Sequence, residues 1–260
     1  MDINNFVVDH VIRGTAFSQK DGSVLFTINQ IQNPSLNCAS ESTDAVDALG
    51  TPIATFYRAK SAEFSAENAL FDMNLLATQL GTTKKIATAA DKIVVPAFET
   101  INYVANKTNY TLKHTPKVAP TEIYMLNGDS TLGKKFTAAT SASATEFVIA
   151  GTDLTAPTGL TAGDQLYVMY EYESETASSV VNSATNFPTG CKFVMEVLGC
   201  DVCDQTTQIF AYLVFNNAKL SPDFDWSIAT DGAHPFSMRA QQDYCDKEKK
   251  LFEIIIPDVE

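Results

Sequence analysis

The chain has 260 residues, 45% hydrophobic and 19% charged, and at this length it can bury a substantial core without cross-links. Its 18 Lys and Arg against 31 Asp and Glu leave a formal net charge of -13. This balance excludes a general nucleic-acid binder, which needs a basic surface to displace counterions. There is no apolar run of about 18 residues and no basic segment followed by an apolar one at the start, so we expect neither membrane spanning nor Sec export.

Strand patterns dominate the first part of the chain. Val24–Ile28 follows a Lys-Asp-Gly-Ser turn signature and is predicted as the first strand, after a short N-terminal segment. Residues 52–60, rich in aromatic and β-branched side chains, are predicted as another strand. One helix is predicted within residues 66–81, because its apolar residues recur at helical spacing. Its apolar stripe is formed by Leu70, Met73, Leu76, Ala77 and Leu80. Glu67 lies at its start, and Gly81 follows as a C-terminal stop.

Beyond the helix the pattern returns to strands. We predict strands at 92–95, 97–104 and 110–113. Residues 114–180 are rich in Thr, Ala and Ser and contain several turn signatures, with short strands between them at 122–126, 135–137, 146–149 and 165–173. The final part predicts longer strands at 192–198, 208–215, 224–229, 236–243 and 251–256.

This order predicts a mostly-β protein, an antiparallel β-sandwich or barrel with one short helix and an inserted β-rich region. We expect residues 1–113 and 166–260 to form the main sandwich or barrel. Residues 114–165 are the expected insert, either Ig-like or a system of hairpins.

Five cysteines form an odd set in a long chain without an export signal, so we expect reduced thiols. Cys200 and Cys203 have the spacing of a metal or redox pair, but their turn between two predicted strands is not a thioredoxin-like site. A zinc site would need Cys191 and Cys245 brought in by the fold. A disulfide between subunits stays open. The fifth cysteine is Cys38.

Catalytic motifs are missing from the sequence: it has no phosphate-binding loop, dinucleotide fingerprint, zinc-protease helix or nucleophile elbow. We expect His10, His114 and His234 to lie in turns or at the surface. Glu171 and Glu173 share a strand face, where solvated acids are common. We therefore predict no catalytic, cofactor-binding or metal-binding residues and no enzyme activity.

Two acidic pairs are the other candidates for a ligand. Asp201 with Asp204, and Asp223 with Asp225, have a spacing that a loop cation site could use, although acidic turns are common without one. The single tryptophan, Trp226, lies in the segment DFDWSI, and we expect its ring to pack in the core.

Three segments carry a resemblance to a known family. Residues 50–82, GTPIATFYRAKSAEFSAENALFDMNLLATQLGT, form a strand leading into a short helix that ends in glycine. Residues 163–201 give a Tyr-rich strand, a polar loop, a Phe-Pro turn and a long strand. Residues 215–256 add an Ala-Lys-Leu segment and closing antiparallel strands. This order resembles the virion structural proteins of tailed bacteriophages, particularly tail-tube (major tail) proteins, over roughly 50–100 and 165–260.

The resemblance implies a small β-sandwich or barrel with a flanking helix, in subunits that form stacked hexameric rings joined by long loops or hairpins. It implies a late virion protein assembled in the host cytoplasm, with itself and other virion proteins as partners and no membrane. Genomic DNA would pass through an acidic lumen without specific binding, because a like-charged wall repels phosphates. The net charge of -13 is consistent with that lumen.

Two alternatives stay open. A capsid decoration or head-surface protein would share the β-rich build but bind a capsid lattice. A β-sandwich that binds carbohydrate or a receptor would need an exposed aromatic platform, for which Tyr167, Tyr170 and Tyr172 are the candidates.

Overall fold

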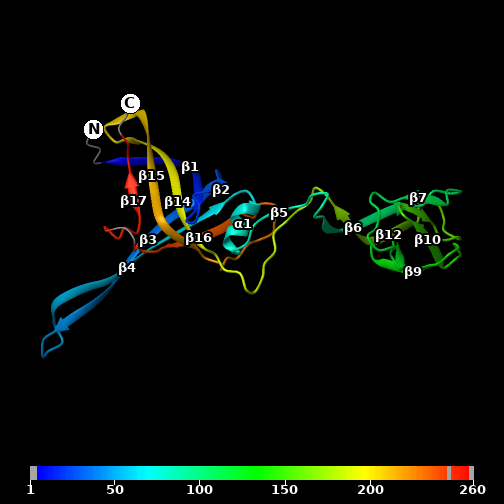
Figure 1. The fold of residues 1–260 in the computed structure, drawn as a ribbon, viewed down its shortest axis with the longest axis horizontal. Coiled ribbons are helices and arrows are strands. Elements are labelled where there is room, and N and C mark those ends of the chain that lie inside the picture. The colour runs from blue at the N-terminus through cyan, green and yellow to red at the C-terminus, as the bar shows by residue number, and fades with distance from the viewer. Residues whose placement is uncertain (1–4, 245–246, 258–260) are drawn as a thin grey trace. The chain divides into compact units, whose positions relative to one another are not determined.

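The computed structural model describes residues 5–244 and 247–257. The chain folds as two compact units, Met1–Lys84 with Val180–Glu260 (unit 1) and Lys85–Ser179 (unit 2). The predicted fold class is confirmed: the described chain is mostly β, with largely antiparallel sheets, in which only β9 and β10 of the described strands pair parallel, and one short helix (Figure 1). No helix within the described ranges is both long and apolar enough to cross a membrane.

Unit 1 is built on one curved antiparallel sheet with the strand order β2-β1-β14-β15-β16-β4-β3, and β17 adds to β15. β15 pairs with β14 along one edge and with β16 and β17 along the other. The strands are β1 (Phe6–Ser18), β2 (Val24–Ile28), β3 (Ile31–Val46), β4 (Pro52–Asn68), β14 (Gly190–Asp201), β15 (Asp204–Leu220), β16 (His234–Ala240) and β17 (Glu253–Ile255).

The core of unit 1 contains a phenylalanine cluster on one side of this sheet. In β14, alternate residues from Cys191 to Val197 are buried, as the period of a half-buried strand requires. Phe193 is fully buried, and its ring lies 5.7 Å from Phe64 and 6.4 Å from both Phe26 and Phe215, centroid to centroid. Aromatic rings at such distances stabilise one another beyond the apolar area they bury.

The helix α1 (Met73–Gln79) begins at Asp72, whose carboxylate accepts hydrogen bonds from the backbone N–H of Asn74 (2.9 Å) and Leu75 (2.7 Å). This is N-capping, which satisfies donors that a helix leaves free at its start. The predicted glycine stop is present, since Gly81 has φ +66, a conformation that L side chains rarely adopt.

The helix begins later than the apolar spacing predicted. Glu67 belongs to β4, and Leu70 precedes the helix with 60% of its surface exposed. The buried helical residues are Leu75, Ala77 and Gln79, so only Ala77 of the predicted stripe is fully buried. The N-cap at Asp72 outweighs the apolar periodicity, because capping sets where the backbone turns helical.

Unit 2 is a seven-stranded sheet with the order β6-β12-β8-β9-β10-β11-β7 and a short β13-β5 pair. Its core contains fully buried Ile123, Phe136, Phe147, Leu154 and Leu166. The strands are β5 (Lys85–Ile86), β6 (Ile93–Asn102), β7 (Asn109–Thr111), β8 (Glu122–Leu126), β9 (Leu132–Ala138), β10 (Glu146–Ala150), β11 (Asp153–Thr155), β12 (Gln165–Ser174) and β13 (Ser178–Ser179).

The borders of unit 2 differ from those expected for the insert, residues 114–165. β12 pairs with β6 from Gln165 opposite Asn102 to Ser174 opposite Ile93. This ladder holds both strands in one unit. Sequence spacing does not reveal it, because the partners lie more than 60 residues apart.

Three other strand predictions need correction. The first strand is β1, starting at Phe6, where a short segment before Val24 was expected. Residues 92–104, predicted as two strands, form the single strand β6; Pro96 is tolerated within it because β6 lies at the sheet edge. Residues 224–229, predicted as a strand, have no regular secondary structure.

Candidate assembly interface

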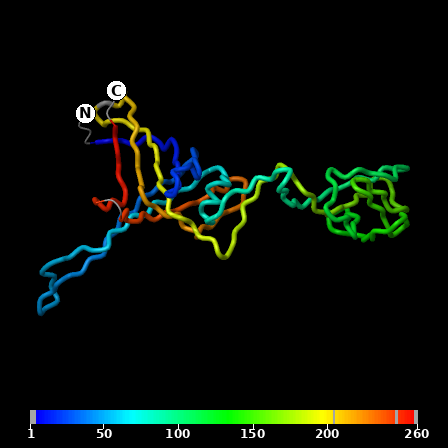
Figure 2. Tube along the Cα trace, in the orientation of Figure 1, coloured from blue at the N-terminus to red at the C-terminus, as the bar shows by residue number. Residues whose placement is uncertain are grey.

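The most exposed part of unit 1 is the outer half of the β3–β4 hairpin, residues 40–60, which we call the arm. Every residue of the arm is exposed, whereas β4 becomes buried again at Ala62 and Phe64. Figure 1 and Figure 2 show β3 and β4 running side by side away from the sheet of unit 1. The arm is therefore a two-stranded ribbon with solvent on both faces.

Large apolar side chains cover this ribbon. Leu49 at the tip is 91% exposed, Tyr57 is 72% exposed and Ile53 is 71% exposed. Val46 and Phe56 are each more than half exposed. Because side chains alternate along a strand, Ile53 and Tyr57 lie on one face and Phe56 on the other. A two-stranded hairpin is at best marginally stable alone in water, so an apolar one of this length is typical of a surface that meets a partner.

The tip of the arm is closed by Asp47. Its Oδ1 accepts hydrogen bonds from the backbone N–H of Leu49 and Thr51, each at 2.8 Å, and its own N–H donates to the Thr51 carbonyl at 2.9 Å. The N–H groups of Thr51 and Leu49 lower the pKa of the Asp47 carboxyl, because they stabilise its charged form. Gly50 supplies the positive φ of +84 that the turn needs.

A bulge marks the base of the arm. The register passes from Ala39 opposite Ser61 to Glu41 opposite Arg58, so Ser40 faces two residues of β4. Ala59 adopts the left-handed region with φ +50, which is uncommon for a residue with a Cβ. Bulges of this kind bend a strand and increase its twist, and this one lies where the arm leaves the sheet.

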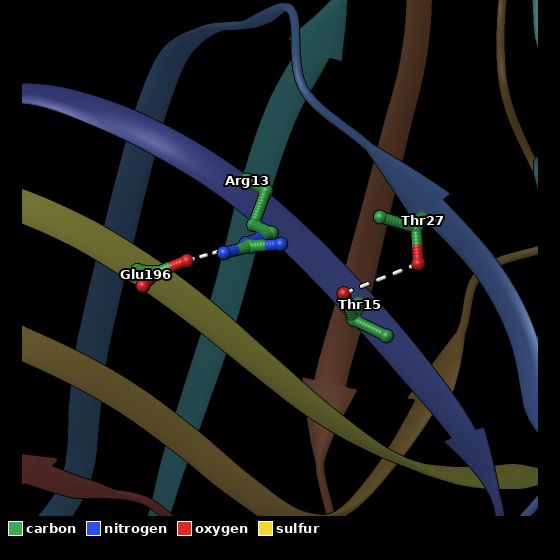
Figure 3. A network of polar contacts seen from close by, with 4 residues as sticks. All are labelled: Arg13, Thr15, Thr27 and Glu196. Atoms are coloured by element: carbon green, nitrogen blue, oxygen red, sulfur yellow. Dashed lines mark hydrogen bonds and ion pairs between the residues drawn. The ribbon is translucent and has the colours of Figure 1, made fainter.

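One face of the sheet of unit 1 carries paired polar groups on β1, β2 and β14 (Figure 3). Arg13 on β1 and Glu196 on β14 are cross-strand partners joined by an ion pair. The hydrogen bond to Glu196 and its charge raise the pKa of the Arg13 guanidinium. Thr15 and Thr27 are cross-strand partners of β1 and β2, with their hydroxyls 3.2 Å apart. The Arg13–Glu196 pair therefore adds no net charge to this face.

The histidines do not come together. His10 is exposed, with Nδ1 2.9 Å from the Asp9 carboxylate. His114 is also exposed, and its ring stacks on Tyr172 at 3.8 Å between centroids. The surface position expected for His234 is wrong: it is completely buried in β16, because α1 and the end of β4 cover it.

The acidic pairs form no cluster of three or more metal-binding side chains within the described residues. The Asp201 carboxylate accepts the backbone N–H of Cys203 at 2.7 Å and so caps the β14–β15 turn. The side chain of Asp204 lies outside the described residues. Asp223 and Asp225 are exposed, as are Glu171 and Glu173.

The described cysteines Cys38, Cys191, Cys200 and Cys203 are free thiols, and Cys245 lies outside the described residues. The pair Cys200 and Cys203 lies at the β14–β15 turn, as the sequence predicts. Cys191 is fully buried in the core, which raises the pKa of its thiol to about 11.

The aromatic candidates separate to opposite faces of β12. Tyr170 is buried, and Tyr172 packs against the same core. Tyr167 lies on the other face, near-parallel to the exposed Phe98 at 6.3 Å. The expected platform of three tyrosines is therefore not formed. The expectation for Trp226 also needs correction, because its ring is half-buried and stacks on Phe71 at 4.7 Å outside the main core.

Sequence patterns did not reveal the arm itself. Residues 31–46 are polar and show no alternation, since both faces of β3 meet solvent along most of its length. The Asp47–Gly50 turn, followed by the β-rich stretch from Pro52, was the available signal for a hairpin here.

A comparison with known protein families finds a match over most of the chain. The model of the YomU/Tube protein family matches residues 6–252, which span both units and include the whole arm. No curated protein matches the chain.

Proposed function

Because the chain belongs to the YomU/Tube protein family, and so is a phage tube-like protein, we propose that it is a non-enzymatic structural subunit that assembles with copies of itself into rings stacked as a tail tube. The family match covers most of the chain and supports a place in the virion. Assembly takes place in the host cytoplasm, alongside the other virion proteins.

The observation that carries the proposal is the arm. It exposes Leu49, Ile53 and Tyr57 on a ribbon that makes no core of its own. A head-to-tail contact between identical subunits closes into rings or extends into a filament, and either use of the arm would bury these side chains. The core of the interface would be apolar, as the centres of homo-oligomeric interfaces are.

The net charge of -13 supports an acidic lumen through which DNA passes. A wall of like charge keeps phosphates at a distance and does not trap them by counterion release. We expect assembled tubes to bind no duplex DNA at low salt, where attraction to a basic surface would be strongest.

The arm is tested by the double substitution Leu49→Ser and Tyr57→Ser, with Val118→Ser in unit 2 as the matched control. Val118 is 74% exposed and lies outside the arm. Because neither arm side chain is buried, we expect the double variant to keep the circular dichroism and melting temperature of the parent. In sedimentation it should stay monomeric at concentrations where the parent and the control form large assemblies. Assembly of the double variant equal to that of the parent would contradict the proposal.

A further inference from the structure

His234 forms a buried polar site in unit 1, outside the arm. Its side chain is fully buried in β16 and is surrounded by three aromatic rings. The centroid of its ring lies 5.6 Å from that of Trp226, 5.7 Å from Phe71 and 5.9 Å from Phe224. Trp226 and Phe224 belong to residues 221–233, which connect β15 to β16 and which we call the strap.

The hydrogen bonds around His234 fix its tautomer. The Nε2 of Gln79, on α1, donates to the carbonyl of Pro235 at 3.1 Å, so the Gln79 Oε1 is left to accept. His234 Nε2 lies 2.8 Å from that oxygen and must therefore carry the hydrogen. In the neutral ring the other nitrogen, Nδ1, is then a bare acceptor, and it is buried without a hydrogen-bonding partner in the described part of the chain.

The described residues make no hydrogen bond to the Nδ1 of this ring. The nearest side chain by register is Asn68, the cross-strand partner of His234 on β4. Its Nδ2 donates to the Leu70 carbonyl, and its buried Oδ1 has no hydrogen-bonding partner among the residues that the structure describes. A proton added to His234 would go to Nδ1 and create a buried cation whose new N–H has no partner, which is a costly arrangement.

Acidic groups lie on or beside the elements around the ring. They are Asp72, which precedes α1, Glu63 and Glu67 on β4, and Asp223, Asp225 and Asp231 on the strap. Burial is the largest influence and lowers the pKa of His234, while the negative charge of Asp72 raises it by less. The Glu67 carboxylate accepts from the Asn33 amide at 3.3 Å, and all three strap aspartates are exposed.

We propose that His234 is a pH-sensitive lock: its neutral imidazole holds the aromatic residues of the strap on α1 and the end of β4, and its protonation releases them. The imidazolium needs water at Nδ1, and water reaches it only when Trp226 and Phe224 move away. The strap moves as a loop between two fixed ends. Ser221 at one end donates its N–H to the Ser237 carbonyl, and β16 at the other end stays paired with β4.

The direction of the pH dependence follows from the geometry. A histidine that is held neutral in the folded state contributes its full stability above its ordinary pKa of about 6.5. That contribution is lost as pH falls below about 6.5 towards the pKa of the folded state. We therefore expect a closed strap at neutral pH and a released strap in mild acid.

Trp226 is the single tryptophan of the chain and lies on the strap, so its fluorescence reports the lock directly. The experiment follows the emission maximum of the full chain from about pH 8 to pH 5, the range in which histidine titrates. We expect a red shift with a midpoint below about pH 6.5, while far-UV circular dichroism stays constant. The His234→Gln variant keeps a donor for Gln79 but has no group that titrates, so its emission should not change with pH.

Two controls separate the lock from other effects. The double variant His10→Gln and His114→Gln removes the other two histidines and should keep the red shift. NMR of the parent with labelled histidine measures the pKa and tautomer of His234 without any substitution, and should show a pKa below the ordinary value with hydrogen on Nε2. A constant emission maximum in the parent, a shift retained by His234→Gln, or a shift that coincides with loss of the far-UV signal would each overturn the proposal.

Discussion

Asp47 and Thr51 close the tip of the arm by bonding each other in both directions, Oδ1 to N–H at 2.8 Å and N–H to carbonyl at 2.9 Å. By accepting two backbone N–H groups, the carboxylate fixes the turn, a role that further backbone hydrogen bonds between strands play elsewhere. The tip is therefore held by hydrogen bonds within the single subunit, although Leu49 at the tip is exposed. An ordered arm loses less conformational entropy when it binds a neighbour.

Asp47→Ala should loosen this tip. Hydrogen exchange at the backbone amides of Leu49 and Thr51 should become several-fold faster, because both lose their acceptor. Since backbone N–H groups lower the pKa of Asp47, the same loosening should appear in the parent as pH falls below the ordinary aspartate value of about 4 and through the lowered pKa. Asp44→Ala, an exposed aspartate on the same arm, is the control and should leave both amides unchanged.

Phe193→Ala should be among the most damaging substitutions in unit 1. Phe193 is fully buried and is the common neighbour of four other phenylalanine rings. Replacing a buried Phe by Ala costs about 3–5 kcal/mol through lost transfer energy and the cavity left behind. Chemical denaturation measures this loss. Phe98→Ala, at a ring 63% exposed in unit 2, should cost far less, and equal losses would contradict the assigned core.

Strands with one buried face could be predicted from the sequence, because alternation records burial on one side only. The predicted bounds match β8 and nearly match β12, whose even-numbered residues from Leu166 to Tyr170 are buried. The same rule explains why β3 was missed. Its outer part has solvent on both faces, so its sequence carries no alternation, although it pairs with β4 along its length with bulges in the register.

Long-range contacts could not be predicted locally. His234 precedes a proline and resembles a turn residue, but Gln79 and Asn68, more than 150 residues earlier, bury it. β1 begins at Phe6 because it pairs with β14 from Phe6 opposite Asp201, a contact across most of the chain. In both cases the tertiary structure overrides the local sequence pattern.

Tyr170 should make unit 2 sensitive to alkaline pH. Its hydroxyl donates to the buried carboxylate of Glu99 and accepts the backbone N–H of His114 at 3.2 Å. Burial and the Glu99 hydrogen bond raise the pKa of Tyr170 to about 12. The unfolded chain ionises first, so stability from this group is complete below about pH 10 and is lost as pH rises from there towards 12.

Tyr170→Phe should remove that alkaline loss and cost about 1–3 kcal/mol at neutral pH, because Glu99 would keep one fewer donor. Chemical denaturation of the parent and the variant, at neutral pH and at alkaline pH, measures the difference in the free energy of unfolding. Tyr124→Phe, at a half-buried tyrosine bonded to Glu122, is the matched control. An unchanged alkaline loss in Tyr170→Phe would contradict the assignment.

The thiols should differ sharply in reactivity. Cys38 and Cys203 are exposed and should react with a thiol reagent in the folded protein. Cys191 should react only after unfolding, since its thiol is fully buried and its pKa is raised to about 11. Mass spectrometry of the labelled peptides identifies each site. Early labelling of Cys191 would show that the core around Phe193 opens in the native state.

The central claim, assembly into a tube, is tested most directly by electron microscopy of the purified full chain at rising concentration. The account predicts rings and stacked tubes with a central channel, and contacts between copies that bury Leu49 and Tyr57 of the arm. Particles that remain single subunits at every concentration, with the arm free, would contradict it.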